Sequence, residues 1–174
     1  LHLSIRRQRQ MCIRDRYEVA AKTVMENNCK RILYIAGKRN GYVTDERIRG
    51  MEDLVKEKNL TMLVRNGEFS ELQARNITLK YAKNKDIVVC ASDLMAIGAM
   101  KALIQMDIFR PVCGFDGIIL MGYVGKQMNT VRQDFASISE SAMEELHGLM
   151  NGGHGRNIVM KHSLVRMKYE DIIA

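Results

Sequence analysis

From Tyr17 onward, apolar runs of strand length alternate with longer amphipathic segments. The runs that predict strands are RILYIAG (31–37), TMLVRNG (61–67), DIVVCAS (86–92), PVCGFDG (111–117), MNTVRQD (128–134) and NIVMKHSLV (157–165). Most of them are apolar without alternation, which is typical of strands buried on both faces. Because segments with helical spacing separate the strands, the sequence predicts an α/β fold: a parallel sheet with helices on both faces.

Three of the helical segments have recognisable starts. Ser70 lies three residues before Gln73, which is the spacing of a capping box. Thr44 opens a helix that is expected to end near Asn59. Either Ser92 or Asp93 is expected to cap the helix that follows them, and Asp93 is interpreted as a cap rather than a ligand contact.

The formal net charge of +7 is not evidence of a nucleic-acid partner. The head, residues 1–16, holds five arginines and one aspartate, a net charge of +4, so the remaining residues carry only +3. The head has no apolar periodicity that continues into Tyr17. It is interpreted as non-native or disordered, with a genuine basic arm as the alternative, and is excluded from the fold prediction.

Several classes of protein are disfavoured. No run reaches the roughly 18 apolar residues of a membrane span. The four cysteines are scattered without a CxxC pair, as expected of a reduced, cytoplasmic protein. The sequence contains no GxGxxG, GxxxxGK[ST], HExxH or GxSxG motif for dinucleotide, nucleotide, zinc-protease or serine-hydrolase chemistry. It therefore predicts neither an enzyme nor a cofactor or metal site.

The candidate binding residues follow the predicted strands, at the edge where parallel sheets bind ligands. They are Arg47, Phe69, Ser92, Asp116, Gln133 and Phe135. Arginine, carboxylate and amide groups can bind hydroxyls while an aromatic ring packs on the C–H face of a sugar. Each has a plainer alternative: Arg47 as an exposed residue in the first turn of a helix, and the two phenylalanines as core residues.

A series of motifs resembles the effector-binding core of lactose/galactose-repressor-type bacterial transcription regulators. The motifs are RxxG (47–50), GEF (67–69), CASDLMAIGAMKAL (90–103), GFDGI (114–118), NTVRQDF (129–135) and SLVRM (163–167). The resemblance implies a periplasmic-binding-protein-like type I fold with two subdomains and the effector between them. It also implies a homodimer that binds operator DNA through a separate helix-turn-helix domain.

Carried over by position, the resemblance gives each candidate residue a role. Arg47 matches the arginine that grips the effector, and Phe69 matches an aromatic pocket position. Ser92 lies at the polar position before the helix-capping aspartate. Asp116 matches the effector-binding aspartate. Gln133 and Phe135 match contacts near the crossover between the subdomains.

The resemblance also implies that the fold is incomplete and consists mostly of the C-terminal subdomain. Residues 17–133 are assigned to that subdomain, 134–157 to a helix of the largely missing N-terminal subdomain, and 158–174 to a strand that returns. The predicted function is that of the ligand-sensing part of a sugar-responsive regulator without a membrane partner. The alternatives are a solute-binding protein of a sugar transporter and a sensor module fused to a signalling output domain.

Overall fold

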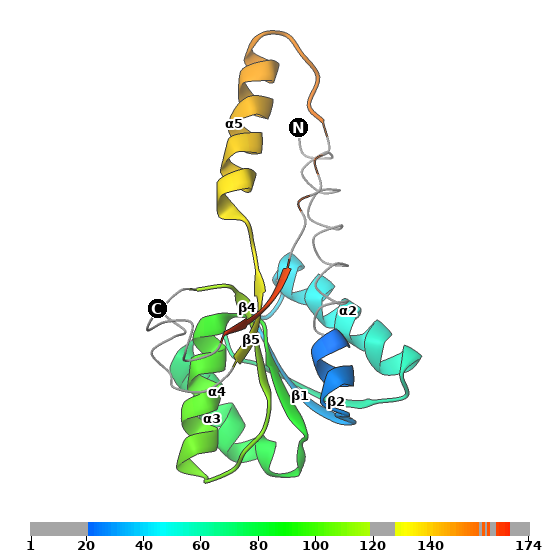
Figure 1. Cartoon of the computed structure of the whole chain (residues 1–174), viewed down its shortest axis with the longest axis vertical. Helices are drawn as coiled ribbons and strands as arrows, with labels where there is room; N and C mark the ends of the chain where they lie inside the picture. Colours follow the sequence, from blue (N-terminus) through cyan, green and yellow to red (C-terminus); the bar gives the residue numbers. More distant parts are fainter. Residues whose placement is uncertain (1–20, 119–127, 157, 159, 161–162, 168–174) are drawn as a thin grey trace.

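The computed structural model describes residues 21–118, 128–156, 158, 160 and 163–167; the predicted head lies outside them. Six strands form one sheet in the order β2-β1-β3-β4-β5-β6 (Figure 1). The strands are β1 (Arg31–Ala36), β2 (Thr61–Asn66), β3 (Ile87–Cys90), β4 (Val112–Asp116), β5 (Met128–Arg132) and β6 (Ser163–Met167). β1 to β5 run parallel to one another, and β6 is antiparallel to β5. The predicted parallel sheet is confirmed.

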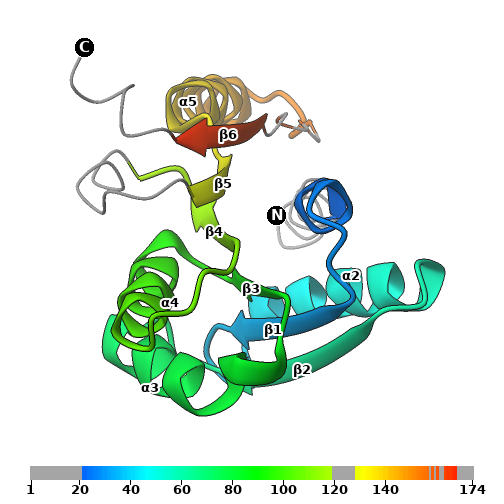
Figure 2. The same ribbon diagram turned by 60° about the horizontal axis from the view of Figure 1, so that its bottom comes forward.

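Helices cover both faces of this sheet. α2 (Tyr42–Glu57) and the helical segment 21–26 lie on one face, whereas α3 (Glu71–Tyr81) and α4 (Asp93–Gln105) pack together on the other (Figure 2). The 3-10 turn η1 (Ala82–Asn84) follows α3. α2 begins at Tyr42 behind the N-cap Gly41, slightly earlier than the expected start at Thr44.

The helix starts predicted from serine residues are confirmed. Ser70 is the N-cap of α3, and its hydroxyl oxygen accepts a hydrogen bond from the Gln73 backbone N–H at 3.4 Å. Of the two candidate caps for α4, Ser92 is the residue used: its hydroxyl oxygen accepts from the Met95 N–H at 3.3 Å. Each bond satisfies one of the unpaired amides in the first turn of a helix.

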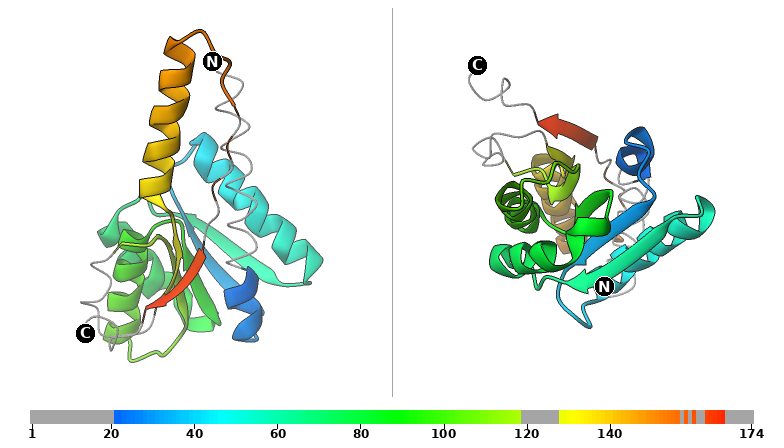
Figure 3. Two further views of the ribbon diagram at one scale, coloured as in Figure 1. Left: turned by 45° about the horizontal axis from the view of Figure 1, so that its top comes forward. Right: turned by 90° about the horizontal axis from the view of Figure 1, so that it is seen from below.

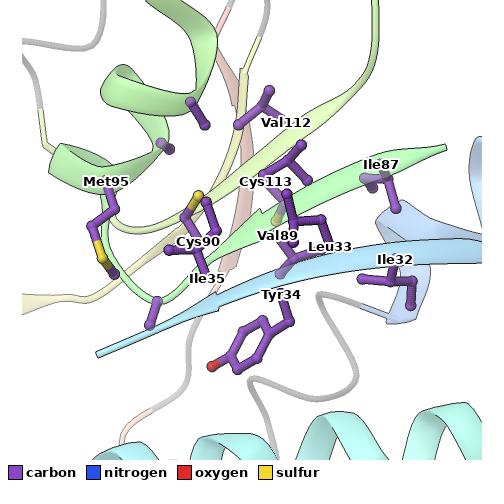
Figure 4. Packing of buried hydrophobic residues seen from close by; sticks show 14 of the residues in the cluster. Ile32, Leu33, Tyr34, Ile35, Ile87, Val89, Cys90, Met95, Val112 and Cys113 are labelled. Carbon is purple, nitrogen blue, oxygen red and sulfur yellow. The ribbon is translucent and has the colours of Figure 1, made fainter. Parts of the chain in front are cut away.

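The core explains why the central strands carry apolar residues at every position. In β1, Tyr34 points toward α2 while its neighbour Ile35 points toward the opposite face, which carries Met95 of α4 (Figure 4). β3 is buried throughout, and Cys90 and Cys113 are buried thiols. Burial raises the pKa of Cys113 to about 12, so this thiol is neutral. Each fully buried aliphatic side chain contributes about 1.5–3 kcal/mol.

α3 and α4 approach each other closely at Gly98. A Cβ built there would lie 2.1 Å from the backbone carbonyl oxygen of Glu71 and 3.2 Å from the backbone nitrogen of Arg75. Two side-chain pairs flank this contact: Lys101 donates to Glu71 at 2.6 Å, and Arg75 donates to Gln105 at 2.8 Å. A residue with no side chain therefore sets the distance between the two helices.

Asp86 ties the start of β1 to the chain entering β3. Its Oδ2 accepts from the backbone N–H groups of Lys30 and Arg31 at 3.0 and 2.8 Å. Its Oδ1 accepts from Nε and Nη2 of the Arg31 guanidinium at 3.1 and 2.7 Å. The side-chain hydrogen bond from Arg31, aided by the two backbone amides, holds the pKa of Asp86 well below its usual range.

This depressed pKa predicts a pH-dependent loss of stability. Because the folded-state pKa lies below the unfolded value of about 3.9, the contribution is present above that pH and is lost as the pH falls further. We expect the difference in free energy of unfolding between wild type and Asp86→Asn to be largest near neutral pH and to shrink below about pH 4. Urea unfolding across this range measures it. Asp53→Asn, the same change at an exposed position of α2, is the matched control. A difference for Asp86→Asn that varies with pH no more than that of the control would contradict the prediction.

α5 (Phe135–Met150) leaves the sheet after β5 and projects beyond it (Figure 3). None of its residues is buried. Large apolar side chains are exposed along it: Phe135, Met143, Leu146, Leu149 and Met150. After α5 the chain returns to the sheet, where β6 pairs with β5. An amphipathic helix that buries nothing presents an apolar face that water solvates poorly.

Among the described residues, no helix is long and apolar enough to cross a membrane. Within the same residues, no group of three or more His, Cys, Asp or Glu side chains is placed to hold a metal ion.

Candidate ligand-binding site

The candidate residues lie toward the carboxyl ends of five parallel strands, because each ends a strand, follows one or lies in the helix that comes after it. Arg47 is on α2 after β1, Phe69 follows β2, and Ser92 follows β3. Asp116 ends β4, Gln133 follows β5, and Phe135 is the first residue of α5. The topology therefore places all six on one edge of the sheet, where open parallel sheets bind ligands.

Arg47 reaches from α2 across the ends of the central strands. Its Nη1 donates to the carbonyl oxygen of Ala91, after β3, at 2.7 Å. Its guanidinium carbon lies 4.6 Å from the centre of the Phe115 ring on β4. Burial lowers the pKa of Arg47, while Tyr34 and Asp116 act in the opposite direction. The side chain is half-buried, so the interpretation of Arg47 as an exposed helix residue is wrong.

One nitrogen of the Arg47 guanidinium is unsatisfied among the described residues. Its Nε is buried and has no hydrogen-bond partner within the part of the chain that the structure describes. An unpaired buried donor is costly, on the order of 1–3 kcal/mol. The guanidinium remains protonated in this environment.

Asp116 and Gln133 are joined at the next two strand ends. The Gln133 Nε2 donates to Asp116 Oδ1 at 3.3 Å. Asp116 also has an unusual backbone conformation, with φ of 124°, and Gly117 follows with φ of 75°. Positive φ at a residue other than glycine costs on the order of 1–3 kcal/mol and is concentrated at functional sites. The strained backbone of this turn thus holds the Asp116 carboxylate beside the Gln133 amide. The carboxylate is also close enough to Arg47 to raise the pKa of the guanidinium.

The expectation that Asp93 is a helix cap is wrong. The capping role belongs to Ser92, and the Asp93 carboxylate turns toward the neighbouring strands. Its Oδ1 accepts from the Thr130 hydroxyl at 2.6 Å, and its Oδ2 accepts from the Ile118 N–H at 2.8 Å. Burial raises the pKa of Asp93, against the lowering effect of Thr130 and the backbone amides of the turn. Ser92 lies at the predicted edge, but its oxygen is engaged in the helix cap.

The two phenylalanines are not core residues, because Phe69 is 40% exposed and Phe135 is 58% exposed. Phe69 has φ of 56°, and its ring lies so close to Gly37 that a Cβ there would be 2.2 Å from the ring Cζ. The Thr44 hydroxyl borders the same spot, one helical turn before Arg47. Phe69 is thus adjacent to the Arg47 side of the edge, whereas Phe135 lies at its far end, at the start of α5.

The roles of three residues at this edge were not predicted from the sequence: Phe115, which lies beneath the Arg47 guanidinium, and the buried pair Asp93 and Thr130. Phe115 stands beside the predicted carboxylate, so the alternation of side chains along GFD was a usable signal. The Asp93–Thr130 contact joins residues 37 positions apart. No local pattern indicates a contact at that separation.

A well-formed pocket lies elsewhere. It has a volume of about 390 Å³ and is lined by Met100, Leu103, Phe109 and Asn129, among others, near the beginning of β4 and β5. That is the opposite end of the sheet from the candidate residues.

A parallel sheet covered on both faces, with polar side chains gathered at the carboxyl ends of its strands, defines a class of ligand-binding α/β domains. Residues 21–167 match the model of the periplasmic binding protein-like domain family, and the chain belongs to that family. The resemblance inferred from the motifs is confirmed by its relatives, which are helix-turn-helix-type transcriptional regulators.

Two curated relatives and one solved structure illustrate the similarity. The transcriptional regulator MalR of Clostridium butyricum is 30% identical over 130 residues, covering 68% of this chain and 39% of MalR. The transcriptional repressor PurR of Vibrio vulnificus strain CMCP6 is 27% identical over 138 residues, covering 74% of this chain and 41% of PurR. A dimeric Lac repressor with an 11-residue C-terminal deletion superposes with a TM-score of 0.82 at 20% identity, over 88% of this chain and 60% of the repressor. The chain spans about two fifths of the curated relatives' length.

Proposed function

We propose that the chain is part of the effector-binding core of a sugar-responsive transcription regulator. The observation that carries the proposal is the group Arg47, Asp116 and Gln133 at one edge of the sheet, where Arg47 binds the Ala91 carbonyl oxygen and Gln133 binds Asp116. The relatives favour a regulator over a transporter component, because they are named as transcriptional regulators and repressors. We expect no catalytic turnover.

The chemistry of the group suits a neutral polyhydroxylated ligand. A carboxylate accepts from two adjacent hydroxyls, and a guanidinium donates to two hydroxyl oxygens. The Gln133 amide supplies both a donor and an acceptor. The exposed rings of Phe69 and Phe135 can each cover the apolar face of a sugar ring. Fixed polar groups combined with aromatic surface are the usual composition of a small-molecule site.

The cleft would lie between two lobes. In this proposal residues 17–133 form the C-terminal subdomain, 134–157 lie in the N-terminal subdomain, and 158–174 return to the first. α5 supports the division, since it buries none of its residues and exposes Phe135, Met143, Leu146 and others. A second lobe packed on that apolar face would also form the other wall of the cleft.

Regulation would follow from a shift of populations. An effector that binds both lobes favours the closed arrangement over the open one by as much as its affinities for the two differ. In a cytoplasmic homodimer, closure would change the spacing of the DNA-binding domains and thus the affinity for operator DNA. The helix-turn-helix named in the relatives would belong to a separate part of the complete gene product.

Calorimetry on the complete gene product tests this proposal, with maltose, lactose, glucose and ribose as probes and adenine as a planar, non-sugar control. We expect one sugar to bind and adenine not to.

Arg47→Lys keeps the charge but loses the planar group that stacks on Phe115, so we expect roughly tenfold weaker binding. The bound sugar should also change the affinity for DNA from the gene's own promoter, and hydrogen exchange should be slower along α5 than in the 174-residue chain.

Different outcomes separate the rival functions. Binding of adenine in preference to every sugar would overturn the sugar assignment while leaving a ligand sensor. Sugar binding with no effect on DNA, by a gene product that begins with a leader peptide, would favour the solute-binding protein of a transporter. A signalling domain in place of a DNA-binding domain would favour the fused sensor.

A further inference from the structure

Asp93 is a buried carboxylate that the proposed effector contacts do not use. It is the first residue of α4 and 0% exposed, yet Ser92 makes the helix cap. A carboxylate with no access to solvent cannot contact an effector directly. Its position under the site therefore calls for another role.

The carboxylate connects three elements at the carboxyl edge of the sheet. It accepts from Thr130 on β5 at 2.6 Å and from the Ile118 N–H, just after β4, at 2.8 Å. The Thr130 hydroxyl oxygen in turn accepts from the Gly117 N–H at 3.2 Å. Asp93 and Thr130, both fully buried, thus engage two successive backbone amides of the turn that follows Asp116.

That turn has a conformation that the chain would not keep unaided. Asp116 and Gly117 both have positive φ, which L-residues rarely adopt. Gly117 also lies against β5, where an added Cβ would come within 2.9 Å of the Arg132 Cα. Hydrogen bonds to a buried carboxylate are among the stronger ones in proteins, so they can hold such a turn in place.

We propose that Asp93, acting through Thr130 and the Ile118 amide, is a positioning residue that holds the Asp116–Ile118 turn and thereby aims the Asp116 carboxylate at Gln133 and the effector site. The effector part of this statement rests on the function proposed above, but the positioning of the turn does not. A change at the buried pair should therefore move Asp116 even in the absence of any sugar.

Thr130→Val and Thr130→Ser form the matched pair that tests the positioning role. Valine keeps the shape of threonine without its hydroxyl, whereas serine keeps the hydroxyl without the methyl group. In ¹⁵N-labelled 174-residue chain, the scalar coupling between the Asp116 amide and Hα protons reports its φ, and the Gln133 side-chain amide reports the contact with Asp116. We expect Thr130→Val to lose the small coupling that corresponds to a φ of 124° and to shift the Gly117, Ile118 and Gln133 signals. Thr130→Ser should restore the wild-type values.

Each alternative result has a defined meaning. If Thr130→Val lowers the melting temperature but leaves the turn and Gln133 signals unchanged, Asp93 is a structural residue only and the proposal is overturned. Unchanged signals with unchanged stability also overturn it. If Thr130→Val does not fold, Asp93→Asn serves as the second variant: it can accept from only one of its two donors, and the same signals must move. None of these readings needs a sugar, so a failure of the sugar assignment is distinguishable.

Discussion

Replacing Asp116 by asparagine is expected to weaken sugar binding by roughly 30- to 150-fold, which corresponds to about 2–3 kcal/mol. The substitution keeps the size of the side chain and its ability to accept from Gln133, but removes the negative charge that faces Arg47. A hydroxyl donates more strongly to a carboxylate than to an amide, and an amide can accept at only one atom. Titration calorimetry on the complete gene product measures the loss.

Stability should change little in the same variant. Asparagine tolerates positive φ better than most residues, so it can keep the conformation that Asp116 adopts. We expect the melting temperature to move by no more than about 2 °C. Asp45→Asn is the matched control, because it removes a negative charge from an exposed position in the first turn of α2, on the same edge of the sheet. Equal losses in the two variants would indicate a general charge effect, and undiminished binding by Asp116→Asn would remove Asp116 from the site.

The elements of the sheet could be predicted because their signals are local. Runs such as RILYIA and IVVC are apolar at every position, and only a strand covered on both faces requires that pattern. The caps of α3 and α4 are also local, since each joins a serine to an amide three residues later. Once the strands are placed, the rule that ligands bind at their carboxyl ends makes Arg47 and Asp116 candidates. The family resemblance then gives each of them a role.

The roles of Asp93 and Gly98 could not be predicted in the same way. Asp93 follows Ser92 at a helix start, and local reasoning assigns such a residue to capping. Its partners are Thr130 on β5 and Ile118 just after β4, and only the assembled sheet brings them within 3 Å. From the sequence alone, Gly98 is a residue of low helix propensity within a helix. Its close contact with α3 is evident only once the neighbouring helix is in place. Features set by local sequence could therefore be predicted, whereas roles that depend on contacts between distant segments could not.

Gly98→Ala should destabilise the protein, although alanine is the better helix former. In an exposed helix this substitution stabilises by about 1 kcal/mol. Here the new methyl group would lie 2.1 Å from the Glu71 carbonyl oxygen, a backbone atom that cannot rotate away. α3 and α4 would have to separate, and overpacking of this kind typically costs 1–3 kcal/mol, so we expect a melting temperature lower by several degrees.

Gly148→Ala in α5 is the matched control for that experiment. Among the described residues, a Cβ at Gly148 meets no atom within 4 Å, so only the intrinsic preference of alanine for the helix is expected to act. Circular dichroism should show equal or greater helix content for Gly148→Ala, while thermal unfolding of Gly98→Ala shows the loss. The opposite signs of two identical substitutions would isolate the contact between α3 and α4. If both variants are stabilised, the two helices are not held at the separation that Gly98 permits, and the face of the sheet beneath them is less tightly packed than its buried side chains imply.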